Sequence, residues 1–276
     1  MQPAQASRLG DGRLHLHHGP IDLIIEAWGD GVEAAYIRAS QRFSTVLEEL
    51  MAEIELLRQP LGNIQPQGRI ARRMVGAIRP FTGVFVTPMA AVAGAVADEI
   101  CAVLAQGDIA RAYVNNGGDI AVFLTEGQSL TAMIHDGADA GRVRFKAGDF
   151  ARGVATSGWR GRSHSLGIAD AVSVVARDAA RADVAATLIA NAVDLPGHGA
   201  IKRCAAQDLS PDSDLGERQV TVDVGALDKR ETHTALGAGA QVARKMLEDG
   251  MIDGAVLFLN GQNTQIGRDA FLHLPE

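Results

Sequence analysis

The sequence predicts an α+β fold, because its strands come in runs and do not alternate regularly with helices. Alternating apolar and polar residues mark strands within residues 13–29 and again between residues 112 and 146. Longer segments with apolar residues three and four positions apart predict helices between and after these runs. Since no repeat or composition shift divides the 276 residues, we expect one domain over residues 1–276. The alternative is the same domain with two lobes, about 1–110 and 111–276.

In the first half of the chain, residues 13–29 alternate Ile21, Leu23 and Ile25 with polar residues, as a β-hairpin does. Apolar spacing then predicts one long helix from Val32 to Leu57, and a shorter one over residues 70–78 ends at a proline. The β-branched valines of "GVFVTP" (83–88) predict a brief strand. A helix over residues 89–107 follows, with almost no large side chain in its first ten residues, so another backbone or a flat ligand can approach it closely.

Strands dominate the middle of the chain, and helices and strands share the last third. The expected strands are Ala112–Val114, Ile120–Leu124, Leu130–His135, Val143–Lys146, 150–158, 171–177, 220–224 and 254–260. The expected helices cover residues 179–193 and 232–248.

The composition excludes some classes of function. The formal net charge is −7, so the chain has no basic surplus for a broad nucleic-acid interface. No window is apolar enough to span a membrane, and the N-terminal segment lacks a signal-peptide pattern. We therefore expect a cytoplasmic protein without nucleic-acid or membrane partners. A local cluster of Arg69, Arg72, Arg73 and Arg79 is interpreted as a solvated helix face.

Residues 115–120, "NNGGDI", join two expected strands with small and polar residues. Gly117 and Gly118 permit backbone conformations that other residues avoid, and bare N–H groups in such a turn can bind anions. Asn116 and Asp119 flank them. The alternative is a wide structural turn.

A second candidate site is "ATSG", residues 155–158, at a strand end. Thr156, Ser157 and Gly158 offer hydroxyls and an open backbone to a phosphate, ahead of a basic loop that contains His164. Ser157 and His164 could form a nucleophile and base, but no G-x-S-x-G motif surrounds the serine.

The third candidate lies in "ADVAATLIAN", where Asp183 and Thr187 are four residues apart on an expected helix. Their oxygens therefore project from one face and could hold Mg²⁺ together with the phosphates of a substrate. The alternative is that Asp183 interacts with the helix dipole and Thr187 faces a neighbouring segment.

The order in which these motifs follow one another is more informative than any one of them alone. "AGAVAD", "VNNGGDI", "VATSG", a histidine-containing loop and "ADVAAT" follow one another within about residues 85–195. In this order they resemble the ApbE-type FAD:protein FMN transferases, whose motifs are K-G-x-x-x-D, N-x-G-G-D, T-S-G, H-x-x-D-P-x-T-G and D-x-x-x-T. The resemblance implies an ApbE-like fold with mixed or antiparallel sheets flanked by helices.

The resemblance also implies an activity and its residues. FAD would be split, and its FMN half would be attached to a threonine or serine of an acceptor protein with the help of Mg²⁺. Asp183 and Thr187 correspond to the metal ligands, and His164 to the histidine of the catalytic loop. Two further motifs correspond to nucleotide-binding positions: Asn116, Gly117, Gly118 and Asp119, and then Thr156, Ser157 and Gly158.

Two departures keep a second hypothesis open. Ala93 replaces the motif's lysine, although Gly94 and Asp98 keep the G-x-x-x-D spacing, and "SLGIAD" after His164 lacks D-P-x-T-G. The alternative to the enzyme is a non-catalytic protein that binds a small phosphate-containing ligand on the same scaffold. The small-residue helix also admits a homodimer interface.

Overall fold

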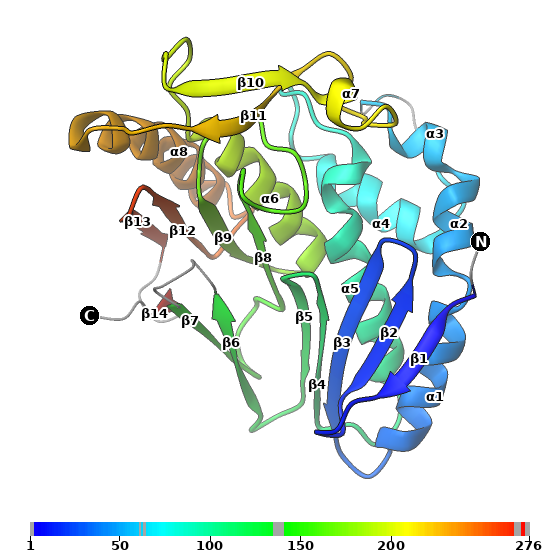
Figure 1. Cartoon of the computed structure of the whole chain (residues 1–276). Coiled ribbons are helices and arrows are strands. Elements are labelled where there is room, and N and C mark those ends of the chain that lie inside the picture. Colours follow the sequence, from blue (N-terminus) through cyan, green and yellow to red (C-terminus); the bar gives the residue numbers. More distant parts are fainter. Residues whose placement is uncertain (1–2, 61, 63–64, 135–140, 268–271, 274–276) are drawn as a thin grey trace. The chain divides into compact units, whose positions relative to one another are not determined.

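The computed structural model describes residues 3–60, 62, 65–134, 141–267 and 272–273. The chain forms two compact units. The first contains Met1–Thr131, Arg144–Val154 and Arg177–Asp183, and the second contains Ala132–Val143, Ala155–Ala176 and Val184–Glu276. Both combine antiparallel strand pairs with helices, so the predicted α+β class is confirmed (Figure 1). The single domain over residues 1–276 stays a prediction.

The first unit contains an antiparallel sheet. In spatial order its strands are β1 (Gln5–Arg8), β2 (Leu14–His18), β3 (Ile21–Trp28), β4 (Arg111–Asn116) and β5 (Asp119–Leu124), followed by the start of β8 (Gly153–Ser157). The alternation of β3 buries Leu23 and Ile25 completely, which explains why this hairpin could be predicted. The register pairs Asn116 with Asp119, so β4 and β5 meet at a two-residue turn.

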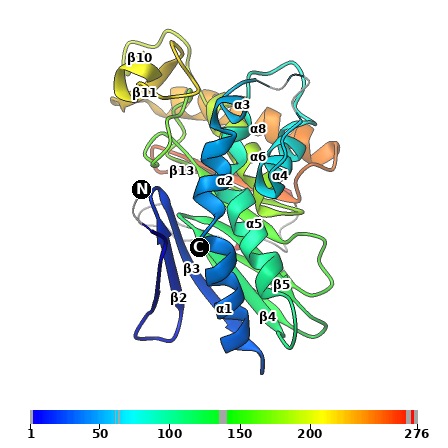
Figure 2. The same ribbon diagram turned by 90° about the vertical axis from the view of Figure 1, so that its right-hand side faces the viewer.

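Helices cover one face of this sheet (Figure 2). They are α1 (Val32–Phe43), α2 (Val46–Ala52), α3 (Ile54–Leu57), α4 (Arg69–Ile78), the 3₁₀ helix η1 (Pro88–Ala91), α5 (Val92–Leu104) and the first turns of α6 (Ala179–Ala192). α5 packs on β4 and β5, and α1 and α4 pack on α5. The central position of α5 explains why its small residues are buried on almost every side.

Two expectations for this unit are wrong. The helix expected over Val32–Leu57 breaks after Phe43 and again at Glu53. Ser44 Oγ donates to the carbonyl of Gln41 at 2.8 Å, so this hydroxyl competes for a backbone acceptor where the first break occurs. "GVFVTP" (83–88) forms no strand; Val84 is 54% exposed, and β propensity has no effect without a neighbouring strand.

The second unit contains four consecutive strands of the nine-stranded sheet. They are the end of β8, β9 (Ala171–Ala176), β12 (Gly254–Leu259) and β13 (Gln262–Gly267), in that order. The helix α8 (Lys229–Glu248) packs on β12 and β13, and it begins with a capping box between Asp228 and Glu231. Both β9 and β12 are buried along their whole length, so they form the core of this unit.

The remaining elements include several that sequence patterns did not indicate. The hairpin of β10 (Ile201–Ala205) and β11 (Gln219–Val224) encloses α7 (Ala206–Leu209), and β14 (Leu272–His273) pairs with the first residues of β7 (Gly141–Lys146). The strand expected over Leu130–His135 is confirmed as β6 (Ser129–Ile134), and His135 lies outside the described residues. No helix in the described ranges is long and apolar enough to cross a bilayer.

Candidate functional site

The "NNGGD" segment is a tight turn, and the wide turn considered as an alternative is not found. Gly117 and Gly118 alone connect the strands, with φ angles of 65° and 115° that favour glycine. Asn115 Oδ1 accepts the N–H of Gly118 at 2.8 Å. Asn116 Nδ2 donates to the carbonyl of Ala93 at 3.0 Å and so ties the turn to the start of α5. The polar residues beside the glycines therefore fix the turn and its position.

The small residues of α5 receive the first turn of α6. A Cβ on Gly94 would lie 2.2 Å from the carbonyl oxygen of Ala179, so only glycine fits there. One oxygen of the buried Asp98 carboxylate accepts the N–H of Ala179 at 3.0 Å, and the other accepts the N–H of Ala180 at 3.0 Å. Because Ala179 and Ala180 are the first residues of α6, their N–H groups have no acceptor within the helix, and Asp98 supplies one for each. The expected close approach of a backbone to this helix is confirmed, and Gly94 and Asp98 are the residues that hold α6.

This anchoring positions Asp183 in the second turn of α6. Asp183 Oδ2 accepts the N–H of Gly94 at 3.0 Å, which fixes the carboxylate beside the start of α5. Burial raises the pKa of Asp183 well above its usual range, and the nearby carboxylate of Asp119 raises it further. Two neighbouring carboxylates in a largely desolvated position are stabilised by a cation.

The buried position of Asp98 makes stability depend on pH. Burial, followed by repulsion from Asp178, raises the pKa of Asp98 to about 7, whereas it is about 3.9 in an unfolded chain. Between about pH 4 and about pH 7 the unfolded state has released this proton and the folded state keeps it. We therefore expect the free energy of unfolding to fall as pH rises through this window, by up to about 1.4 kcal/mol per pH unit for this group.

Urea unfolding of the wild type and of Asp98→Asn, at about pH 5 and about pH 7, measures this contribution. The asparagine does not titrate, so the variant should lose less stability between the two pH values than the wild type, even though it is less stable at both. Asp208→Asn, which alters an exposed residue of α7, should keep the wild-type difference. An equal difference in Asp98→Asn and the wild type would contradict the assignment.

Asp183 and Thr187 lie one turn apart on α6, as predicted, and Thr187 is half-buried. No three Asp, Glu, His or Cys side chains in the described ranges are grouped so that they could hold a metal ion. A cation at Asp183 would therefore take its other oxygens from Thr187, the backbone, water or a substrate phosphate. This donor set fits Mg²⁺, which commonly binds through one or two carboxylates plus phosphate and water.

The other predicted site residues belong to the second unit. Thr156 Oγ1 and Ser173 Oγ are hydrogen-bonded at 2.7 Å across β8 and β9. A Cβ on Gly158 would lie 2.4 Å from the carbonyl oxygen of Asp170, so this glycine has a structural reason to be present. His164 Nε2 lies 3.3 Å from Ser210 Oγ, with either atom able to donate.

The structure thus brings some predicted residues together. In the first unit Asn116 contacts the start of α5, and Asp119 lies near the carboxylate of Asp183. Thr156, Ser157, Gly158, His164 and Thr187 belong to the second unit. The roles of Asn115 and of the Ala93 carbonyl escaped prediction. Only the run of two asparagines before the glycines could have indicated them.

Comparisons with known proteins assign the family. The family model described as "AbpE bacteria" matches residues 5–265, and the chain belongs to this family. It is also 35% identical to a UPF0280 protein of Methanopyrus kandleri over 133 aligned residues. The alignment covers 48% of this chain and 52% of that protein. A UPF0280 protein of Methanosphaerula palustris is 36% identical over 175 residues, with 61% of this chain and 70% of that protein covered. The chain spans about half the length of the first of these relatives.

A solved structure is similar over most of its length. The apo form of the flavinyl transferase ApbE of Pseudomonas stutzeri matches with a TM-score of 0.49 and 12% identity, over 97% of this chain and 94% of that chain. The family model identifies the protein as ApbE-like, and the two relatives described above carry the UPF0280 name.

Proposed function

We propose that this protein is a Mg²⁺-dependent transferase that binds FAD and transfers its FMN half to a threonine or serine of an acceptor protein in the cytoplasm. One observation carries the proposal: a half-buried carboxylate, Asp183, is fixed by the Gly94 N–H beside a second acid, one helical turn before Thr187. This arrangement occurs in a member of the ApbE-like family.

The proposed reaction is a substitution at phosphorus. The acceptor hydroxyl oxygen forms a bond to the phosphorus of the FMN half, the P–O bond of the diphosphate breaks, and AMP leaves with the bridging oxygen. The proton of the hydroxyl is released. Such transfers depend on positioning and charge neutralisation more than on covalent help from the protein.

The residues of the chain supply the positioning. Asp183 and Thr187 would hold Mg²⁺, which would neutralise charge on the diphosphate. The turn at Gly117 and Gly118 presents backbone without side chains, and Asn116 holds that turn to the Ala93 carbonyl. Thr156, Ser157 and Gly158 are assigned to the nucleotide, and His164 is assigned to proton transfer.

A second candidate is a flavin-binding protein without transferase activity. Ala93 in place of the lysine, and the absence of D-P-x-T-G after His164, favour it. Because binding and turnover are separable, both candidates can be tested on the same sample.

The test titrates the full chain into FAD with Mg²⁺ or with EDTA, follows flavin fluorescence, and measures AMP by chromatography after addition of a threonine-containing acceptor peptide. We expect Mg²⁺-dependent FAD binding and AMP release that requires the acceptor. Binding without AMP release would favour the second candidate. No FAD binding at micromolar concentration would contradict both.

A further inference from the structure

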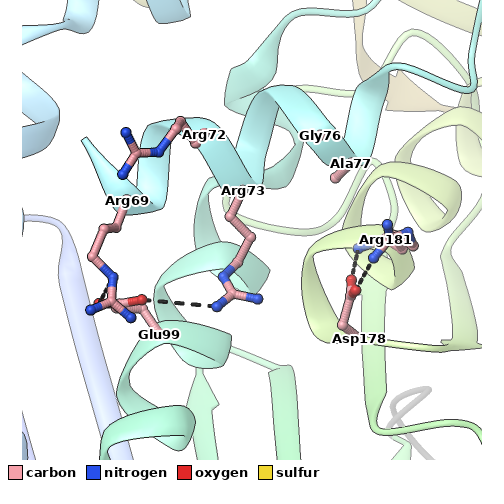
Figure 3. Close-up of a pocket in the computed structure, with 8 residues that line it drawn as sticks. All are labelled: Arg69, Arg72, Arg73, Gly76, Ala77, Glu99, Asp178 and Arg181. Carbon is pink, nitrogen blue, oxygen red and sulfur yellow. Dashed lines mark hydrogen bonds and ion pairs between the residues drawn. The ribbon is translucent and has the colours of Figure 1, made fainter. Parts of the chain in front are cut away.

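The arginine cluster interpreted from the sequence as a solvated helix face lines a pocket of about 410 Å³ in the first unit (Figure 3). Its walls come from α4, α5 and the start of α6, with Arg69, Arg72, Arg73, Gly76, Ala77, Glu99, Asp178 and Arg181 as lining residues. Only Arg79 of the predicted cluster is outside the lining. The interpretation as a solvated face is therefore incomplete.

Positive charge is in excess in this pocket. Four arginines and two acids line it, in a chain whose net charge is −7. Asp178 is paired with Arg181, its neighbour on α6. Glu99 is only 1% exposed and serves three guanidinium groups, with Arg42 at 2.9 Å, Arg69 at 3.4 Å and Arg73 at 3.9 Å. Arg42 also pairs with Glu49 at 2.8 Å, so two carboxylates face these three cations and one positive charge remains in excess.

Three of the four arginines, Arg69, Arg73 and Arg181, are held by acids, and the cluster keeps capacity for a ligand. Figure 3 shows Arg69 and Arg73 extending from α4 to the carboxylate of Glu99, with Arg181 on the opposite side. Arg73 Nε is buried and has no hydrogen-bond partner within the described part of the chain. Arg72 takes part in none of the ion pairs between described residues. A fixed guanidinium group matches the geometry of phosphate oxygens.

We propose that this pocket binds a compact ligand with two linked phosphate groups. Guanidinium groups on two walls, from α4 and from Arg181, fit a ligand with two anionic centres better than a single ion. The volume is within the range of small-molecule sites. The pocket is distinct from the proposed metal site, because Arg181 and Asp183 are two residues apart on α6 and so point about 200° apart around its axis.

Gly76 allows a sharp test, because it lines the pocket and a Cβ there would meet nothing within 4 Å. Gly76→Glu places a carboxylate among the arginines, and Gly76→Gln adds the same bulk without charge. Arg72→Gln removes an exposed cation of the pocket, and Arg79→Gln removes an exposed cation that directly follows α4 and lies outside the pocket lining.

The experiment is isothermal titration of the full chain with pyrophosphate in EDTA, so that no metal contributes, and then with ADP. We expect one pyrophosphate per chain, with binding weakened about tenfold or more by Gly76→Glu and by Arg72→Gln. Gly76→Gln and Arg79→Gln should bind nearly as the wild type does. Tighter binding of ADP than of pyrophosphate would assign the two phosphates to a nucleotide, and the reverse order to a free diphosphate.

Two results would overturn the proposal: no binding of either probe at millimolar concentration, or an equal loss in Arg79→Gln and Arg72→Gln. Because EDTA removes the metal, the result is independent of FAD turnover at Asp183. Failure of this proposal and failure of the proposed transferase activity are thus distinguishable.

Discussion

Asp183→Asn is expected to lower Mg²⁺-dependent FAD cleavage by at least about 100-fold. Loss of a residue that only orients a metal ligand typically costs 10–100-fold, so loss of a charged ligand should cost at least the upper value. The asparagine keeps an oxygen that can accept the Gly94 N–H, so the local fold should persist. Cleavage is measured as AMP release at saturating Mg²⁺.

Stability provides an independent measurement on the same variant. Burial and Asp119 raise the pKa of Asp183, which means that its charged form is destabilised in the folded state. Replacing it with a neutral amide should therefore leave the Tm at neutral pH unchanged or higher. Asp208→Asn, at an exposed position, should keep both the Tm and the activity. An Asp183→Asn protein with wild-type AMP release would contradict the assigned role.

Gly94→Ala is expected to lower the free energy of unfolding by about 2–4 kcal/mol. The added Cβ would lie 2.2 Å from the Ala179 oxygen and 2.4 Å from its carbonyl carbon, so the α6 backbone has to move. That movement also displaces the Asp98 contacts and Asp183, and the activity should fall together with the stability. Urea unfolding and AMP release measure the two effects.

Gly237→Ala is the matched control for this substitution. Gly237 is an exposed glycine within α8, and a Cβ there meets nothing within 4 Å. The same substitution should stabilise this helix by about 0.4–1 kcal/mol, because alanine restricts the unfolded chain and favours helix. A Gly94→Ala protein as stable as the wild type would show that α6 does not depend on this close approach.

Local patterns predicted the fold class and most elements, because several strands and helices bury one regular face. The β3 alternation and the α6 spacing are examples. The break between α1 and α2 was missed because Phe43, Val46, Leu47 and Leu50 continue the apolar spacing across it, and all four are buried. The strand predicted for "GVFVTP" was wrong, because its valines have a high strand propensity but no neighbouring strand to pair with.

The candidate site could be predicted only in part. The spacing of Asp183 and Thr187 predicted that both lie on one face of a helix, and Gly117 and Gly118 predicted a turn. The contacts that position Asp183 join α5 to α6 across 81 to 89 residues: Gly94 to Asp183, and Asp98 to Ala179 and Ala180. No local pattern encodes such a contact. The arginine pocket was missed for the same reason, because Glu99 and Arg181 come from other helices than α4.

Anomalous diffraction from a crystal grown with FAD and Mn²⁺ in place of Mg²⁺ tests the metal site most directly. The proposed function predicts an anomalous peak within about 2.0–2.6 Å of an Asp183 carboxylate oxygen and of Thr187 Oγ1, with diphosphate oxygens completing the coordination. A bound flavin whose metal ion lies elsewhere, with neither of these oxygens coordinated, would contradict it.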